Sequence, residues 1–158
     1  MSYSIMIVED EYWIAMDLAL EIQSHGATAT GPFTSIPQAV EELRRPSNVD
    51  AVILDIGLRS NEVYLLADLL EQADVPFLFA SAQPQDQLPE RFADAPYFEK
   101  PFSTQDCVAA ALSLAKDHAA QSAADGEEGR LQDDGEDKDA SGGEWMTLRA
   151  SPLMKACG

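Results

Sequence analysis

The residues most suited to chemistry are three carboxylates, a serine and a lysine, and each stands where a short apolar run ends: Glu9, Asp10, Asp55, Ser81 and Lys100. Carboxylates brought together repel one another, which raises a pKa and costs stability. A hard cation such as Mg2+ relieves the repulsion, because it binds carboxylate, water and phosphate oxygens. Asp55 would then be a nucleophile toward phosphorus, with Lys100 as a second positive charge and Ser81 as a hydrogen-bond donor. The set predicts phosphoryl transfer.

Each of these residues alone has a common structural explanation. Asp10 and Glu11 could simply begin a helix, whose dipole favours acidic groups at that end. Asp55 could form a turn, and a Lys-Pro pair is frequent in exposed turns. The joint occurrence of all these groups at successive run ends favours the functional interpretation. The bond between Lys100 and Pro101 is predicted to be cis.

The elements that must position these residues alternate between strand and helix. Short apolar runs predict strands at residues 5–8, 27–31, 51–54, 77–80 and 97–99. Apolar residues spaced three and four apart predict helices at 11–24, 35–43 and 62–71, then a weak helical region between Pro84 and Pro89. Ser35 should cap the second helix, and Thr104 should cap a last one.

Five strands that alternate with five helical segments predict an α/β fold with a doubly wound parallel sheet covered on both faces. Ligands of such sheets bind beyond the carboxyl ends of the strands, where the strand order reverses. Four of the five predicted strands end at the residues named above. The fold should therefore bring these residues to one edge of the sheet.

The composition excludes several classes of protein. A net charge of −18 would repel a phosphate backbone, so direct binding of nucleic acid is not expected. No apolar run approaches the ~20 residues that span a bilayer, and no basic stretch precedes the first apolar run as in a signal peptide. Two cysteines make no disulfide framework. We expect a cytoplasmic protein without a membrane partner.

The composition changes near His118, and we predict one domain over residues 1–118. Residues 119–158 are acidic and poor in large apolar side chains until Glu144, which predicts a disordered tail. The last stretch, residues 144–158, regains Trp145 and several aliphatic residues. It could be a short docking peptide, but a frayed end is the more common outcome.

Four motifs give the chain a close resemblance to response-regulator receiver domains over residues 4–118: IMIVEDE, VILDIGL, FLFASA and YFEKPF. The resemblance implies a five-stranded, flavodoxin-like (βα)5 fold with strand order 2-1-3-4-5 and a bound Mg2+. It also implies a role for each matching residue: Glu9 and Asp10 as the acidic pair, Asp10 as a direct metal ligand, Asp55 as the phosphorylated aspartate, the Gly57 carbonyl as a main-chain metal ligand, Lys100 as the active-site lysine, and Ser81 and Tyr97 as the switch residues.

The stretch SNEVYLLADLLEQADVPFLFASA is similar to stand-alone receivers of alphaproteobacteria, although Ser81, Ala82 and Gln83 depart from the motif of that subgroup. The resemblance implies a sensor histidine kinase as partner, or a histidine phosphotransfer protein. It also implies a monomer or a phosphorylation-dependent dimer, and output by protein contact, phosphorelay or use as a phosphate sink rather than as an enzyme. The alternatives are a phosphorylation-independent adaptor and an Asp-nucleophile phosphatase, which would want an aspartate where Gly57 stands.

Overall fold

A five-stranded parallel sheet forms the centre of the computed structural model, which describes residues 2–45, 49–58 and 60–133. The strands are β1 Ser4–Val8, β2 Thr28–Phe33, β3 Ala51–Leu54, β4 Phe77–Ser81 and β5 Tyr97–Glu99. The helices are α1 Tyr12–Ser24, α2 Ile36–Arg44, α3 Ser60–Gln72 and α4 Thr104–Asp133, with 3-10 turns η1 Ile56–Leu58, η2 Gln85–Gln87 and η3 Glu90–Phe92. The order β2-β1-β3-β4-β5 confirms the predicted doubly wound, flavodoxin-like topology.

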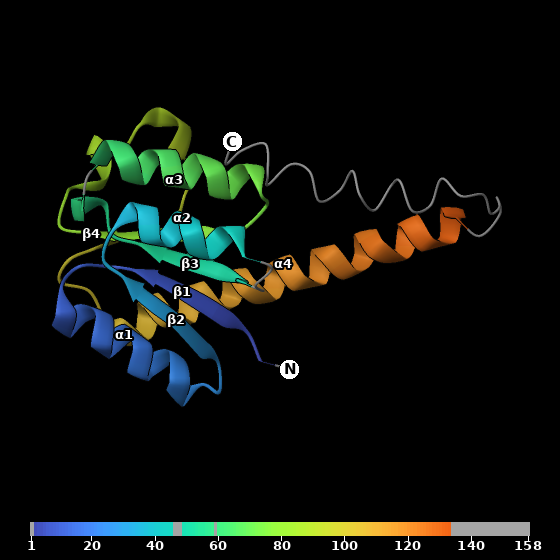
Figure 1. The fold of residues 1–158 in the computed structure, drawn as a ribbon, viewed down its shortest axis with the longest axis horizontal. Helices are drawn as coiled ribbons and strands as arrows, with labels where there is room; N and C mark the ends of the chain where they lie inside the picture. The colour runs from blue at the N-terminus through green and yellow to red at the C-terminus, as the bar shows by residue number, and fades with distance from the viewer. Residues whose placement is uncertain (1, 46–48, 59, 134–158) are drawn as a thin grey trace.

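Helices cover both faces of the sheet (Figure 1). Helices α1 and α4 pack on one face, and α2 and α3 pack on the other. The strands supply both cores because successive side chains point to opposite faces. In β1, Ile5 and Ile7 join the core under α1, while Met6 and Val8 join the core under α2 and α3. Burying each such aliphatic side chain contributes roughly 1.5–3 kcal/mol.

Serine side chains cap two of the helices. Ser35 accepts a hydrogen bond from the Gln38 backbone N–H at 3.4 Å, as predicted for the start of α2. At the start of α4 the cap is Ser103, which accepts from the Asp106 backbone N–H at 3.2 Å. The prediction that Thr104 is this cap is wrong by one residue, since Thr104 already has helical geometry.

The segment between β4 and β5 forms two 3-10 turns in place of a fifth α-helix, in agreement with its predicted weakness. Pro84 and Pro89 precede the two turns, and neither can donate a backbone hydrogen bond. Phe92, which is 1% exposed, anchors the segment in the core beneath α3. The Arg91 guanidinium also binds both carboxylate oxygens of Asp68 on α3, at 3.0 and 3.1 Å.

Helix α4 continues beyond the predicted end of the domain. It passes His118 and runs to Asp133, so the expectation that order ends at residue 118 is wrong for residues 119–133. The sequence AAQSAAD after His118 is rich in alanine, which extends a helix that packing has already nucleated. The rest of the predicted tail, with the 144–158 stretch, lies outside the described residues, and the division into domain and tail stays a prediction.

None of the helices in the described ranges is both long and apolar enough to cross a membrane. Helix α4 has the length, but beyond Ala115 it leaves the core, and its side chains at 119–125 are exposed.

Removing residues 119–158 should change the free energy of unfolding by less than about 1 kcal/mol, because no side chain at 119–125 is buried. Chemical denaturation of the full and shortened chains measures the difference. As a matched control, Leu18→Ala, at a fully buried position facing α4, should cost about 2–5 kcal/mol. A shortened chain that loses as much as this control would contradict the prediction.

Candidate functional site

The backbone register of the sheet brings the predicted site residues to its carboxyl edge. The residue after each of three strands donates its backbone N–H to the last carbonyl of the neighbouring strand: Glu9 to Phe33 at 3.0 Å, Asp55 to Val8 at 2.9 Å and Lys100 to Ser81 at 2.8 Å. These bonds continue the sheet pairing by one residue and fix where each side chain begins. The Lys100–Pro101 bond is cis, as predicted.

The Lys100 ammonium lies among three carboxylates. Its Nζ donates to Glu11 Oε1 at 2.8 Å and to Glu9 Oε2 at 3.2 Å, and it pairs with Asp55 Oδ2 at 3.3 Å. Glu9 is 2% exposed and Asp55 is 3% exposed, whereas the Glu11 side chain is 60% exposed. Among the residues that the structure describes, the site therefore has two buried acids, one acid at its mouth and one cation between them.

The electrostatics of this cluster are unbalanced. Burial raises the pKa of the Glu9 carboxyl to about 8, with a further contribution from the negative charge of Asp55 and a hydrogen bond to it. Burial alone would lower the pKa of Lys100, but the hydrogen bond to Glu11 and the charges of Asp55 and Glu9 outweigh it and raise that pKa. One ammonium thus compensates only part of the negative charge, and a further cation would be favourable.

Carboxylate oxygens of Glu9, Glu11 and Asp55 lie within 4.8 Å of one another, close enough to share one ion. All are hard oxygen ligands, which suits Mg2+. The backbone N–H of Gly57 donates to Asp55 Oδ1 at 2.9 Å, and a Cβ at position 57 would stand 3.3 Å from the same oxygen. Asp10 is exposed and lies outside this group of three. Its role as a metal ligand stays a prediction.

The predicted switch residues Ser81 and Tyr97 are joined through one backbone unit. The Gln83 N–H donates to Ser81 Oγ at 3.1 Å, and the Tyr97 hydroxyl donates to the Gln83 carbonyl. Ser81 is fully buried at the end of β4, and Tyr97 is partly exposed on β5. The Ser81 and Tyr97 side chains thus both bond to the main chain of residue 83.

The structure brings together Glu9, Asp55 and Lys100, with Ser81 on the adjacent strand end. It adds Glu11, which sequence reasoning treated only as the start of a helix. The signal that could have found it is the run of three acids at 9–11, of which Lys100 pairs with the first and the third.

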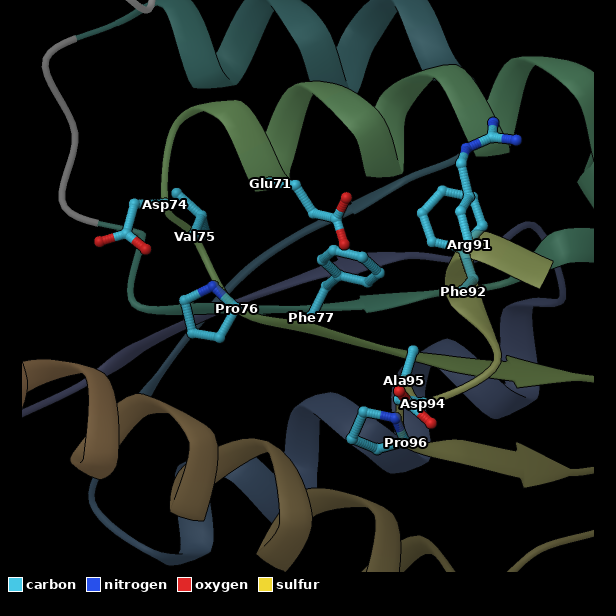
Figure 2. A pocket seen from close by; sticks show the side chains of 10 residues that line it. All are labelled: Glu71, Asp74, Val75, Pro76, Phe77, Arg91, Phe92, Asp94, Ala95 and Pro96. Carbon is cyan, nitrogen blue, oxygen red and sulfur yellow. The ribbon is translucent and has the colours of Figure 1, made fainter. Parts of the chain in front are cut away.

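A second hollow lies at the opposite edge of the sheet, where β4 begins and β5 is about to begin (Figure 2). This groove of about 480 Å³ is lined by apolar side chains, three acids and one arginine: Glu71, Asp74, Val75, Pro76, Phe77, Arg91, Phe92, Asp94, Ala95 and Pro96. None of the predicted site residues lines this groove.

Comparison with known proteins gives a consistent set of relatives. No model of a protein family matches the sequence. The chain is 33% identical over 118 residues to the Phyllosphere-induced regulator PhyR of Methylorubrum extorquens, a match that takes in 73% of this chain and 44% of PhyR. The chain thus spans less than half the length of PhyR.

Solved structures agree with this. The solution structure of SdrG from Sphingomonas melonis Fr1 is 36% identical, with a TM-score of 0.61 over 72% of this chain and 96% of SdrG. The BeF3-activated conformation of SdrG matches with a TM-score of 0.60. A response regulator receiver protein from Burkholderia phymatum, 22% identical, shares the fold with a TM-score of 0.62 over 73% of this chain and 96% of that one. The resemblance predicted from the sequence is confirmed, and the chain belongs to the receiver-domain family of two-component response regulators.

Proposed function

We propose that Asp55 accepts a phosphoryl group from the phosphohistidine of a sensor histidine kinase, in the presence of Mg2+. The observation that carries this proposal is the position of the Asp55 carboxylate. It is buried at a strand end, its Oδ2 lies 3.3 Å from the Lys100 ammonium, and its Oδ1 accepts from the Gly57 backbone. A carboxylate held in this way is oriented for attack, and a positive charge already lies beside it.

In the transfer, a carboxylate oxygen of Asp55 forms a P–O bond while the P–N bond to the donor imidazole breaks. The leaving nitrogen keeps the electron pair and takes up a proton. Lys100 and the Ser81 hydroxyl would bind phosphoryl oxygens, on which negative charge is concentrated. A bound Mg2+ supplies the remaining positive charge, and Glu9, Asp10, Asp55 and the Gly57 carbonyl are the groups that would hold it.

Output follows from the change at Asp55 rather than from turnover of a small molecule. When Ser81 turns toward the phosphoryl group, its contact with Gln83 alters, and Gln83 passes the change to Tyr97. The partners are proteins: the kinase, and a histidine phosphotransfer protein or another acceptor in a relay, unless the chain acts as a phosphate sink. This takes place in the cytoplasm, with the chain a monomer or a phosphorylation-dependent dimer.

Incubation with Mg2+ and acetyl phosphate should give a chain heavier by one phosphoryl group, seen by intact-protein mass spectrometry. Asp55→Asn and chelation of Mg2+ should each abolish the modification, because they remove the nucleophile and the neutralising charge. Asp17→Asn, at an exposed position on α1, is the matched control and should be modified as fully as the unchanged chain. Modification that survives Asp55→Asn would exclude Asp55 as the acceptor.

Without metal, stability should fall as the pH rises from about 4.5 to about 8. The folded chain holds a proton on Glu9 in this window and the unfolded chain does not, so deprotonation favours unfolding. Between pH 6 and pH 8.5 the free energy of unfolding should drop by roughly 2–3 kcal/mol, and Glu9→Gln should remove most of the drop. Denaturation at pH 6 and pH 8.5 with a chelator measures it, and saturating Mg2+ should reduce the dependence. The prediction would be contradicted if the free energy of unfolding depended on pH equally in the unchanged chain and in Glu9→Gln.

Asp10→Asn should weaken Mg2+ binding several-fold while leaving the free energy of unfolding unchanged, because the side chain is exposed and its proposed role is as a metal ligand. Titration calorimetry with Mg2+ measures the affinity. Asp17→Asn again serves as the control for the loss of one acidic charge. An unchanged affinity would remove Asp10 from the metal site.

A further inference from the structure

Glu11 occupies the helix N-cap position but does not act as a cap. Its backbone carbonyl accepts the first hydrogen bond of α1, from Ala15 N–H at 3.0 Å, and its side chain makes no capping hydrogen bond. The usual reason for an acid at the start of a helix therefore does not account for where this side chain lies. The side chain instead reaches across the mouth of the site to Lys100.

Glu11 makes the shortest of the three contacts with Lys100. The ammonium donates hydrogen bonds to Glu11 at 2.8 Å and to Glu9 at 3.2 Å, while Asp55 is held by an ion pair at 3.3 Å. An ammonium has three N–H donors, and Glu11 and Glu9 take two of them while the Asp55 carboxylate lies beside it. The several oxygens of a phosphoryl group would therefore compete with these carboxylates for the ammonium.

Displacement costs least at Glu11. Glu9 and Asp55 are buried, and a buried carboxylate that loses its partner stays without water. Glu11 has 60% of its side chain exposed and can return to solvent. Its backbone does not need to move, because the Glu11 N–H remains bound to Glu9 Oε2 at 3.1 Å.

We propose that Glu11 is a positioning residue that competes with the phosphoryl group on Asp55 for the Lys100 ammonium, and so limits how readily the phosphorylated state forms. This inference rests on the proposed function. A phosphoryl group brings up to two negative charges and oxygens that need Lys100. Binding them breaks the contact between Glu11 and Lys100 and leaves the Glu11 carboxylate near a second anion. Without the Glu11 charge, Lys100 is free to turn inward.

The test uses the full chain at saturating Mg2+ and BeF3−, a tetrahedral mimic of the phosphoryl group, with the dissociation constant measured by titration. Glu11→Gln and Glu11→Ala should each tighten BeF3− binding by about two- to fivefold, the range expected for a partly exposed ion pair. Asp17→Asn is the matched control. Asp17 lines a hollow together with Glu11 and Lys100, but among the described residues it makes no ion pair with the ammonium. This substitution should leave the dissociation constant for BeF3− unchanged.

Several results would overturn the inference. Unchanged or weaker BeF3− binding in both Glu11 variants would do so, and so would an equal gain in Asp17→Asn, which would indicate an effect of overall charge. A tenfold loss of Mg2+ affinity in Glu11→Gln, titrated without BeF3−, would make Glu11 a metal ligand instead. If the unchanged chain binds no BeF3−, the proposed function fails and takes this inference with it. If the unchanged chain binds BeF3− but the variants do not differ, only the inference about Glu11 fails.

Discussion

Two acids are buried side by side at the carboxyl edge of the sheet, and the Lys100 ammonium is what makes their burial tolerable. Parallel pairing of β1 with β3 brings the two acids together, because Glu9 and Asp55 each directly follow the end of one of these paired strands. Burial disfavours the ionised form of Glu9, the negative charge of Asp55 adds to this effect, and together they raise the pKa of Glu9. Strand β5 lies on the far side of β4 from β3, and Lys100, which follows β5, reaches the two acids from there.

Much of this arrangement could be predicted because it depends on strand ends, and strand ends are visible in the sequence. The alternation of apolar runs placed Asp55, Ser81 and Lys100 at one edge. What could not be predicted depends on side-chain reach and on helix length. Nothing local to Glu11 shows that its side chain bends toward a residue 89 positions away. The continuation of α4 past His118 was missed because the absence of apolar residues was taken as disorder, whereas alanine sustains a helix without a core.

The connection from the site to the surface is short and passes through the main chain. Ser81, Gln83 and Tyr97 lie on two adjacent strands and the loop between them, and two hydrogen bonds join them. The loop continues into the 3-10 turns, which Phe92 and the pair of Arg91 with Asp68 tie to α3. The segment between β4 and β5 is thus bonded to Ser81 and Tyr97 at residue 83 and to α3 at residue 91.

Helix α4 extends well beyond the part of it that packs on the sheet. Up to residue 125, where its side chains are described, its last buried side chain is Ala115, yet the helix runs to Asp133, so its final 15 residues extend about 22 Å from His118. Whatever is joined at that end is held on a stiff arm, away from the edge of the sheet where Asp55 lies. A bulky fusion attached there would leave the carboxyl edge accessible to a large partner.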